Sequence, residues 1–368
     1  MNDQLKFQVA LTLLQGVGPV AARNLISYCG SAEAIFREKV SHLIKIPDIG
    51  PVTAKSIVNH KVFDRAEQEC EFISANKIEA FFYLDKKFPK RLTNCNDAPV
   101  LLFFKGKADL NSQRIVAIVG TRNATDYGKL ITEQIVAGLG SEGVMILSGL
   151  AYGIDICAHK SAVRNNITNI GVVGHGLDRI YPSNHRSTAV KMIENGGLLT
   201  EFISGTNPDR ENFPARNRIV AGMCDAVVVI ESAEKGGALI TADVAGSYNR
   251  DVFAVPGNIN NTYSTGCNYL IKENKAALVE SAADIIKMMR WVPGDEAKST
   301  KAKQRLLFND LDTEEEKMVN LLQENGPLHF DGISLNSSFT PGKIAKILLD
   351  LELKGIVKAL PGKQFQLI

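Results

Sequence analysis

Residues 114–149, RIVAIVGTRNATDYGKLITEQIVAGLGSEGVMILSG, decide the fold of this protein. An apolar run ends in a glycine loop, an amphipathic helical pattern (DYGKLITEQIVAGLG) follows, and a second apolar run (GVMILSG) comes directly after it. Continuous Val/Ile runs are typical of strands buried on both faces, and intervening helices are typical of parallel pairing. The stretch therefore predicts one strand-helix-strand unit of a parallel sheet.

The same alternation continues as far as residue 290. Four further runs have strand character: NIGVVGHG (169–176), GLLTEF (197–202), DAVVVIES (225–232) and DVFAVPG (251–257). Helix-compatible sequence such as ITADVAGSYN (240–249) separates them. We predict an α/β domain at 112–290, built as a doubly wound parallel sheet with both faces covered.

The N-terminal residues 1–65 contain an internal repeat, GVGPVAARNLI (16–26) and DIGPVTAKSIV (48–58). In both copies a Gly-Pro pair precedes apolar residues spaced three and four apart, which predicts a tight turn into a helix. The pattern resembles paired helix-hairpin-helix motifs of DNA-binding proteins, and a small helical bundle without DNA contact is the alternative. A connecting region, 66–111, follows with two aromatic-rich, strand-like runs.

The C-terminal part is predicted to be a linker at 291–311 and a winged helix at 312–368. Thr313 and Glu316 have the spacing of a capping box, and a second helix begins at Thr340-Pro341 before a predicted β-hairpin. Lys343 and Lys346 are positioned to face DNA, but the acidic first helix leaves a protein-interaction role equally open.

The composition restricts the class of protein. The 42 basic and 40 acidic side chains leave a net charge of +2, so a polyanion site must be a local patch. Six cysteines without CxxC pairing favour reduced thiols and a cytoplasmic location, and no apolar stretch approaches the length of a membrane span. We expect no metal, no cofactor and no membrane attachment.

Polar glycine loops follow most of the predicted strands. Because ligands of open parallel sheets gather at the carboxyl ends of the strands, these loops predict a phosphate-binding rim. The expected DNA-binding residues are Gly120, Thr121, Arg122, Ser148, Gly149, Tyr152, Gly153, Arg210, Phe213, Arg216, Asn217, Lys235, Gly236 and Gly237. Asp155 is expected to cap the following helix. Neither GxGxxG with a downstream acidic residue nor GxxxxGK[ST] is present, which argues against dinucleotide and ATP sites of those kinds.

The segment FPARNRIVAG (213–222), with Arg210 just upstream, has the composition of a single-strand platform. Arginine binds phosphates bidentately, and an exposed phenylalanine stacks on bases. The alternative is that Arg216 and Arg218 pair with internal carboxylates while Phe213 belongs to the core. We expect Arg218 to brace the helix.

No constellation of side chains specifies a reaction. His159 and His175 lack a partnering nucleophile motif, so we expect structural roles and no catalytic residue. If the protein were an enzyme, Glu201 and Glu231 at strand ends would be the acid/base candidates.

The ordered motifs VGTR, SGLAYGID, HGLDRIYPSN, FPARNRIVAG, GGALITA, VFAVPG and TGCNYLI closely resemble the DNA-processing protein A (DprA/Smf) family. The resemblance implies an extended Rossmann-like core, an N-terminal helix-hairpin-helix or SAM-like domain, and a C-terminal winged helix. It implies a single-stranded DNA-binding protein that protects incoming DNA, forms a homodimer through the Rossmann-like domain, and loads the RecA recombinase during natural transformation. Family DNA contacts correspond to Arg122, Arg210 and Phe213.

This sequence departs from the family pattern at Tyr152, where many members have arginine, and in GGALITA, which lacks a hydroxyl near Gly237. The alternative function is a nucleotide or phosphoribosyl hydrolase on a related Rossmann-like fold. The sequence ESAEKGGALITA lacks the PGGxGT loop typical of such enzymes.

Overall fold

The centre of the fold is a nine-stranded sheet with the strand order β1-β2-β6-β5-β4-β3-β7-β8-β9. Its strands are β1 (Glu79–Phe82), β2 (Leu101–Gly106), β3 (Ile115–Val119), β4 (Met145–Ser148), β5 (Asn169–Val172), β6 (Gly197–Thr200), β7 (Ala226–Val229), β8 (Asp251–Ala254) and β9 (Ala277–Leu278). Neighbouring strands from β6 through β9 are parallel, whereas β2 is antiparallel to both β6 and β1. This confirms the predicted parallel sheet and adds two antiparallel strands at one edge.

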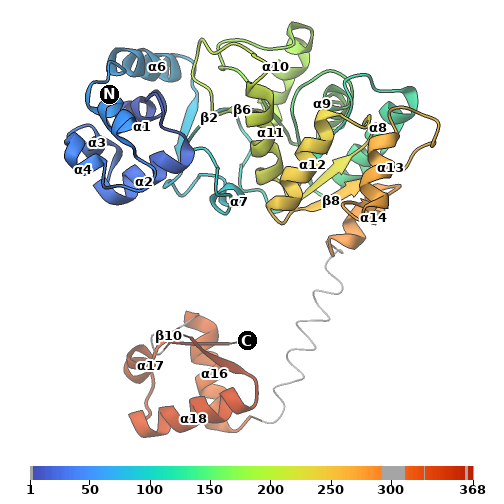
Figure 1. The fold of residues 1–368 in the computed structure, drawn as a ribbon. Helices are drawn as coiled ribbons and strands as arrows, with labels where there is room; N and C mark the ends of the chain where they lie inside the picture. Colours follow the sequence, from blue (N-terminus) through green and yellow to red (C-terminus); the bar gives the residue numbers. More distant parts are fainter. Residues whose placement is uncertain (1–2, 292–310, 327, 361–363, 368) are drawn as a thin grey trace. The chain divides into compact units, whose positions relative to one another are not determined.

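Helices cover both faces of this sheet (Figure 1). The chain advances from β3 to β6 through α8 (Asp126–Ser141), α9 (Ile154–Arg164), the short helix η1 (Ser183–His185) and α10 (Arg186–Asn195), and then returns to β7 beside β3. Right-handed crossovers therefore place α8, α9 and α10 on one face and the next helices on the other. These are α11 (Asn212–Met223), α12 (Gly237–Ser247) and α13 (Thr265–Lys272), and α14 (Ala282–Met288) packs against α8.

The computed structural model describes residues 3–291, 311–326, 328–360 and 364–367, and it separates into two units, 1–290 and 291–368. The predicted linker, 291–311, lies outside the described residues apart from its two ends. The two units are described separately.

The N-terminal helices are α1 (Asp3–Thr12), α2 (Pro19–Cys29), α3 (Ala32–Ile35), α4 (Val40–Leu43), α5 (Pro51–Val58) and α6 (Phe63–Ala75). Gly18 and Gly50 are the N-caps of α2 and α5, as the repeat predicts, although Val58, expected in the apolar stripe, is exposed. The domain boundary expected at residue 65 falls inside α6.

The connecting region 66–111 is not a separate segment, because its strands complete the sheet. Alternate side chains of β2 point to opposite faces: Leu101 and Phe103 belong to the core of the N-terminal helices, and Leu102 and Phe104 belong to the core under the central sheet. A single strand therefore holds the helical domain and the α/β domain together. The short helix α7 (Lys90–Thr93) lies between β1 and β2.

The C-terminal unit has its own apolar core, which includes Met318, Ile344 and Leu351. It comprises α16 (Thr313–Asn325), β10 (Leu328–His329), α17 (Phe330–Asn336), α18 (Pro341–Leu353), β11 (Val357–Leu360) and β12 (Gln364–Leu367), with the sheet order β10-β12-β11. The capping box of α16 is formed by Asp312 and Glu315, one residue earlier than predicted. Lys343, one of the two lysines considered for DNA contact, forms an ion pair with Glu314 of α16.

Candidate nucleic-acid interface

A shallow hollow of about 60 Å³ lies at the carboxyl ends of β4 and β5. Four planar side chains from four segments border it: Arg122, Tyr152, Tyr181 and Phe213. We call these four residues the aromatic rim. They come respectively from the loops after β3, β4 and β5 and from the first turn of α11. The glycine loops therefore do converge at one edge of the sheet, as their positions after parallel strands require.

Arg122 and Tyr181 both pack beside the Phe213 ring. The Arg122 guanidinium carbon lies 5.3 Å from the centroid of the Phe213 ring, and the Tyr181 ring lies 6.4 Å from that ring at an interplanar angle of 36°. Tyr152 packs edge-on against the His185 ring, 4.9 Å away. Arg122 forms no ion pair with a carboxylate among the described residues, and its side chain is exposed. A free guanidinium beside partly open rings is suited to a phosphate and its neighbouring base.

Tyr181 is a rim residue that the sequence analysis did not select. Its side chain is 45% exposed, the same fraction as that of Tyr152. The signal was present in HGLDRIYPSN, where an aromatic residue and a proline end a polar loop after a strand. An aromatic residue in such a loop is equally compatible with a core position, so only the fold identifies it.

Two glycines hold the first two loops of the rim together. Gly153 has φ +79°, and a Cβ atom there would lie 2.1 Å from the carbonyl oxygen of Thr121. A Cβ on Gly120 would lie 2.5 Å from the side chain of Ile154. The backbone N–H of Ile154 donates to the Thr121 carbonyl, 3.2 Å away. The close packing at Gly120, Thr121 and Gly153 thus fixes the position of the backbone at Arg122.

Arg216 and Ser148, both expected among the DNA-binding residues, are buried. The Arg216 side chain borders the hollow from below, is 5% exposed, and donates from Nη1 to the Val172 carbonyl at 2.8 Å. Ser148 is fully buried and donates to the Ile118 carbonyl at 2.6 Å. Gly149 is required here because a Cβ would lie 1.9 Å from Arg216 Nη1.

Asp155 balances the charge of Arg216. Its Oδ2 accepts the backbone N–H groups of Gly149 and Ala151 at 3.2 and 3.4 Å, so it orders the loop instead of capping α9, whose N-cap is Gly153. Burial raises the pKa of Asp155 and lowers the pKa of Arg216, and the attraction between the two groups opposes both shifts. Asp155, through Gly149 and Ala151, and Arg216, through Val172, thus support the hollow from buried positions.

The three arginines near α11 therefore have three different environments. Arg218 forms an ion pair with Glu201 in a partly buried position, which confirms its expected bracing role. Arg210 is exposed in the loop before α11 and forms no ion pair with a described carboxylate. Asn217 is partly exposed.

The loop after β7 does not reach the hollow. Lys235 and Gly237 are exposed, and Gly236 is the N-cap of α12, where a Cβ would lie 2.3 Å from Ser232 Oγ. None of these three residues borders the hollow. These residues remain a candidate DNA contact on the same edge of the sheet, separate from the hollow.

The crevice between β3 and β7, where the winding of the sheet reverses, contains an internal carboxylate. Glu231 is 1% exposed, and its side chain accepts the N–H of Thr125 at 2.9 Å and the Thr125 hydroxyl at 2.5 Å. Thr125 is the N-cap of α8, and a Cβ on Gly128 would lie 2.2 Å from Glu231 Oε2. In dinucleotide-binding folds a phosphate takes this place at the helix N-terminus.

Both histidines considered as bases have structural partners. His159 Nδ1 lies 2.9 Å from the side-chain oxygen of Asn169, and burial lowers the pKa of His159 to about 4. His175 Nδ1 donates to the Gly176 carbonyl at 2.8 Å, and its Nε2 accepts the N–H of Tyr181 at 3.2 Å. These contacts fix the neutral tautomer of His175 and connect it to the rim.

Two further observations concern the described residues only. No group of three or more His, Cys, Asp or Glu side chains in the described ranges is arranged to hold a metal ion. None of the helices described for this chain is both long enough and apolar enough to cross a membrane.

Comparison with known proteins gives three family matches. Residues 79–290 match the family described as DNA recombination-mediator protein A, residues 9–60 match a SAM-like tandem helix-hairpin-helix, and residues 302–363 match the DprA winged helix domain. The predicted types of the flanking domains are thereby confirmed.

Similar proteins have been named and solved. Protein Smf of Synechocystis is 31% identical over 99% of both chains, and the DNA processing protein DprA of Streptococcus pneumoniae is 40% identical over 66% of this chain and 84% of its own. The X-ray structure of the S. pneumoniae protein aligns with a TM-score of 0.65 at 33% identity, covering 78% of this chain and 98% of that one. A structure of the Helicobacter pylori DNA processing protein A, a protein with a described single-stranded DNA binding mode, aligns with a TM-score of 0.53 at 29% identity, covering 58% of this chain and 95% of that one.

Proposed function

Because the chain belongs to the DNA recombination-mediator protein A family, we propose that it is a DNA-processing protein that binds single-stranded DNA at the aromatic rim. The observation that carries this proposal is the Arg122 guanidinium over the Phe213 ring, beside the partly open Tyr181 and Tyr152 rings. The relative from H. pylori, which binds single-stranded DNA, supports it.

The proposed binding mode uses two physical contributions. Base stacking on Phe213, Tyr181 and Tyr152 contributes affinity without base preference, because every base has a π-face. Arg122, and Arg210 in the neighbouring loop, supply cations for phosphates, which makes the affinity dependent on salt. With an overall charge of only +2, these local cations carry the electrostatic part of the binding.

We propose a non-catalytic role. The two carboxylates at strand ends are already engaged, Glu201 with Arg218 and Glu231 with Thr125, and neither has an open face toward the hollow. The hydrolase alternative expects a PGGxGT loop where this chain has ESAEKGGALITA, and at the N-terminus of α8 the Glu231 carboxylate would repel a phosphate. Turnover of a nucleoside monophosphate that is lost in Glu231→Gln would favour the hydrolase instead.

The test is the affinity for a labelled oligothymidine, measured by fluorescence anisotropy across a series of salt concentrations. Arg122→Ala and Phe213→Ala should each weaken binding, the latter by about 1–3 kcal/mol for each base that it stacks. Lys107→Ala, a change outside the rim, is the control. Absence of binding by the unmodified protein at low salt would refute the proposal.

The finer parts of the proposal concern partners and location. We propose that the bound strand is passed to the RecA recombinase, that the protein forms a homodimer through its α/β domain, and that it acts in the cytoplasm. Six free cysteines support a reducing compartment. Mass measurement in solution tests the dimer, and RecA filament formation on coated single strands, with and without this protein, tests the loading step.

A further inference from the structure

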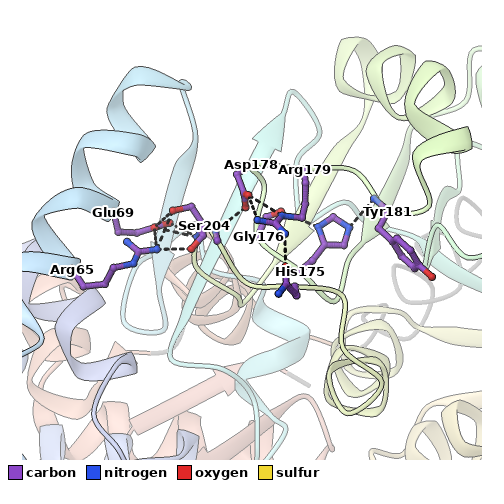
Figure 2. Close-up of polar contacts among 10 residues, drawn as sticks. Arg65, Glu69, His175, Gly176, Asp178, Arg179, Tyr181 and Ser204 are labelled. Atoms are coloured by element: carbon purple, nitrogen blue, oxygen red, sulfur yellow. Dashed lines mark hydrogen bonds and ion pairs between the residues drawn. The ribbon is translucent and has the colours of Figure 1, made fainter.

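The loop between β6 and α11, residues 203–211, carries Arg210 and leads directly to Phe213. We call it the rim loop. It contacts the helical domain on one side, at Ser204, and the loop after β5 on the other, from Gly205 onward; Figure 2 shows Glu69 and Arg65 at Ser204, with Asp178 and Arg179 on the opposite side. A loop that bears an exposed arginine is thus held by residues that do not border the hollow themselves.

The contact with the helical domain is centred on Glu69 of α6. Its carboxylate is 2% exposed and accepts the backbone N–H of Ser204 at 2.9 Å and 3.1 Å, one distance for each oxygen. The Ser204 hydroxyl donates to the same carboxylate. Arg65 neutralises Glu69 at 2.8 Å and donates to the Ser204 hydroxyl at 3.0 Å and to its carbonyl. All the polar groups of Ser204 are therefore engaged by two residues of α6.

The contact on the opposite side is made by Asp178 and Arg179. Gly205, which has φ +83°, donates its N–H to Asp178 Oδ1 at 2.9 Å. Arg179 pairs with Asp178 at 2.8 Å and donates to the side-chain oxygen of Asn207. Burial opposes ionisation of Asp178, but the Gly205 N–H and Arg179 outweigh it and hold its pKa below the ordinary value.

The contacts at Ser204, Gly205 and Asn207 determine where the exposed end of the rim loop lies. The Asn207 carbonyl accepts from the Asn212 side chain at 2.9 Å and from the Asp209 N–H at 2.9 Å, and the Asn212 N–H donates to the Asp209 carbonyl at 3.0 Å. These bonds form a compact turn that contains Arg210 and ends one residue before Phe213. A shift at Ser204 or Gly205 would therefore be transmitted to both of the DNA-facing side chains.

We propose that Glu69 is a positioning residue of the DNA interface, through which the N-terminal helical domain sets the place of Arg210 and Phe213. The inference rests on the proposed binding of single-stranded DNA. It gives the helical domain a function in binding even without DNA contact of its own, because α6 holds the rim loop by charge-assisted hydrogen bonds.

The experiment compares oligothymidine affinities of Glu69→Gln, Asp178→Ala and Glu71→Gln in the full chain. Glu71 is exposed on the same helix, so Glu71→Gln is the matched control and should leave the affinity unchanged. Glu69→Gln should weaken binding by about threefold to tenfold, the range expected when charge-assisted hydrogen bonds hold a contact in place. Asp178→Ala, which removes the acceptor of the Gly205 N–H, should have an effect in the same direction.

A double-mutant cycle with Arg210→Ala separates positioning from general destabilisation. If Glu69 acts through the rim loop, Glu69→Gln should have a smaller effect in the Arg210→Ala background than in the unmodified protein. Thermal unfolding verifies that each variant is folded. Equal effects in both backgrounds, or unchanged binding by folded Glu69→Gln and Asp178→Ala, would overturn the inference and leave the proposed function intact. Failure of the unmodified protein to bind would instead refute the proposed function.

Discussion

The arginines in and near α11 differ in role because successive positions on a helix point in different directions. Arg216 and Arg218 lie two positions apart in α11, which separates their directions by roughly 200° around the helix axis. Arg216 therefore reaches the end of β5 while Arg218 reaches Glu201. Arg210 precedes the helix and stays exposed. Residue type alone does not distinguish these three environments.

Removing Arg216 should destabilise the protein more than removing the exposed Arg210. Arg216→Ala removes the donor to the Val172 carbonyl and the cation that partly offsets the burial of Asp155, and we expect a loss of about 1–3 kcal/mol in the free energy of unfolding. Urea denaturation measures it. Arg210→Ala is the control and should stay within about 0.5 kcal/mol of the unmodified protein. Similar stability of the two variants would show that Arg216 does not act as a buried support.

Tyr152 occupies a position where many family members have arginine, so Tyr152→Arg should add one phosphate contact. We expect the slope of log affinity against log salt concentration to become steeper by about 0.7, the value for one charge on a single strand. Oligothymidine titrations at several salt concentrations measure it, with Tyr152→Phe, which keeps the ring, as the control. An unchanged slope would mean that position 152 lies away from the phosphates.

At the scale of elements, α8 and α9 are joined to the sheet through polar groups as well as through their apolar faces. The N-terminus of α8 receives the Glu231 carboxylate, and α9 presents His159 to the Asn169 side chain on β5. His159 is fully buried, so α9 can pack in this way only while the imidazole is neutral. The stability of this layer therefore depends on pH.

The pH dependence has a definite sign. Burial lowers the pKa of His159 from its ordinary value of 6.5 to about 4, so the unfolded chain binds the extra proton between these values. Stability is then complete above pH 6.5 and is lost as the pH falls toward 4, by up to about 3 kcal/mol. His159→Gln should flatten this part of the stability curve in urea unfolding. An equally steep curve for His159→Gln would assign the acid sensitivity to another group.

At the scale of the whole molecule, the chain consists of two units with different relations to the proposed function. The helical domain shares β2 with the α/β domain, so residues 1–290 form one unit. The C-terminal unit has a separate core around Met318, Ile344 and Leu351. Every residue of the aromatic rim belongs to the first unit.

A protein ending at residue 291 should therefore fold and keep most of the affinity for single strands, since the rim and its supports are retained. Residues 311–368 alone should show a cooperative unfolding transition because they have their own core. Circular dichroism and anisotropy titrations check both expectations. Loss of oligothymidine binding by a folded 1–291 protein would show that the winged helix contributes to the same site.

The sequence by itself determined the parallel sheet, the flanking domain types and the edge at which the loops converge. Hydrophobic periodicity, glycine positions and strand ends are local properties, and motif order identified the family. Tertiary structure alone decided that Arg216 and Ser148 are buried, that Tyr181 joins the rim, and that Glu231 closes the crevice. It also decided that Glu69, separated by 135 residues from Ser204, holds the rim loop. Such contacts depend on which strands and helices become neighbours, and chain connectivity across a nine-stranded sheet is not encoded in any local pattern.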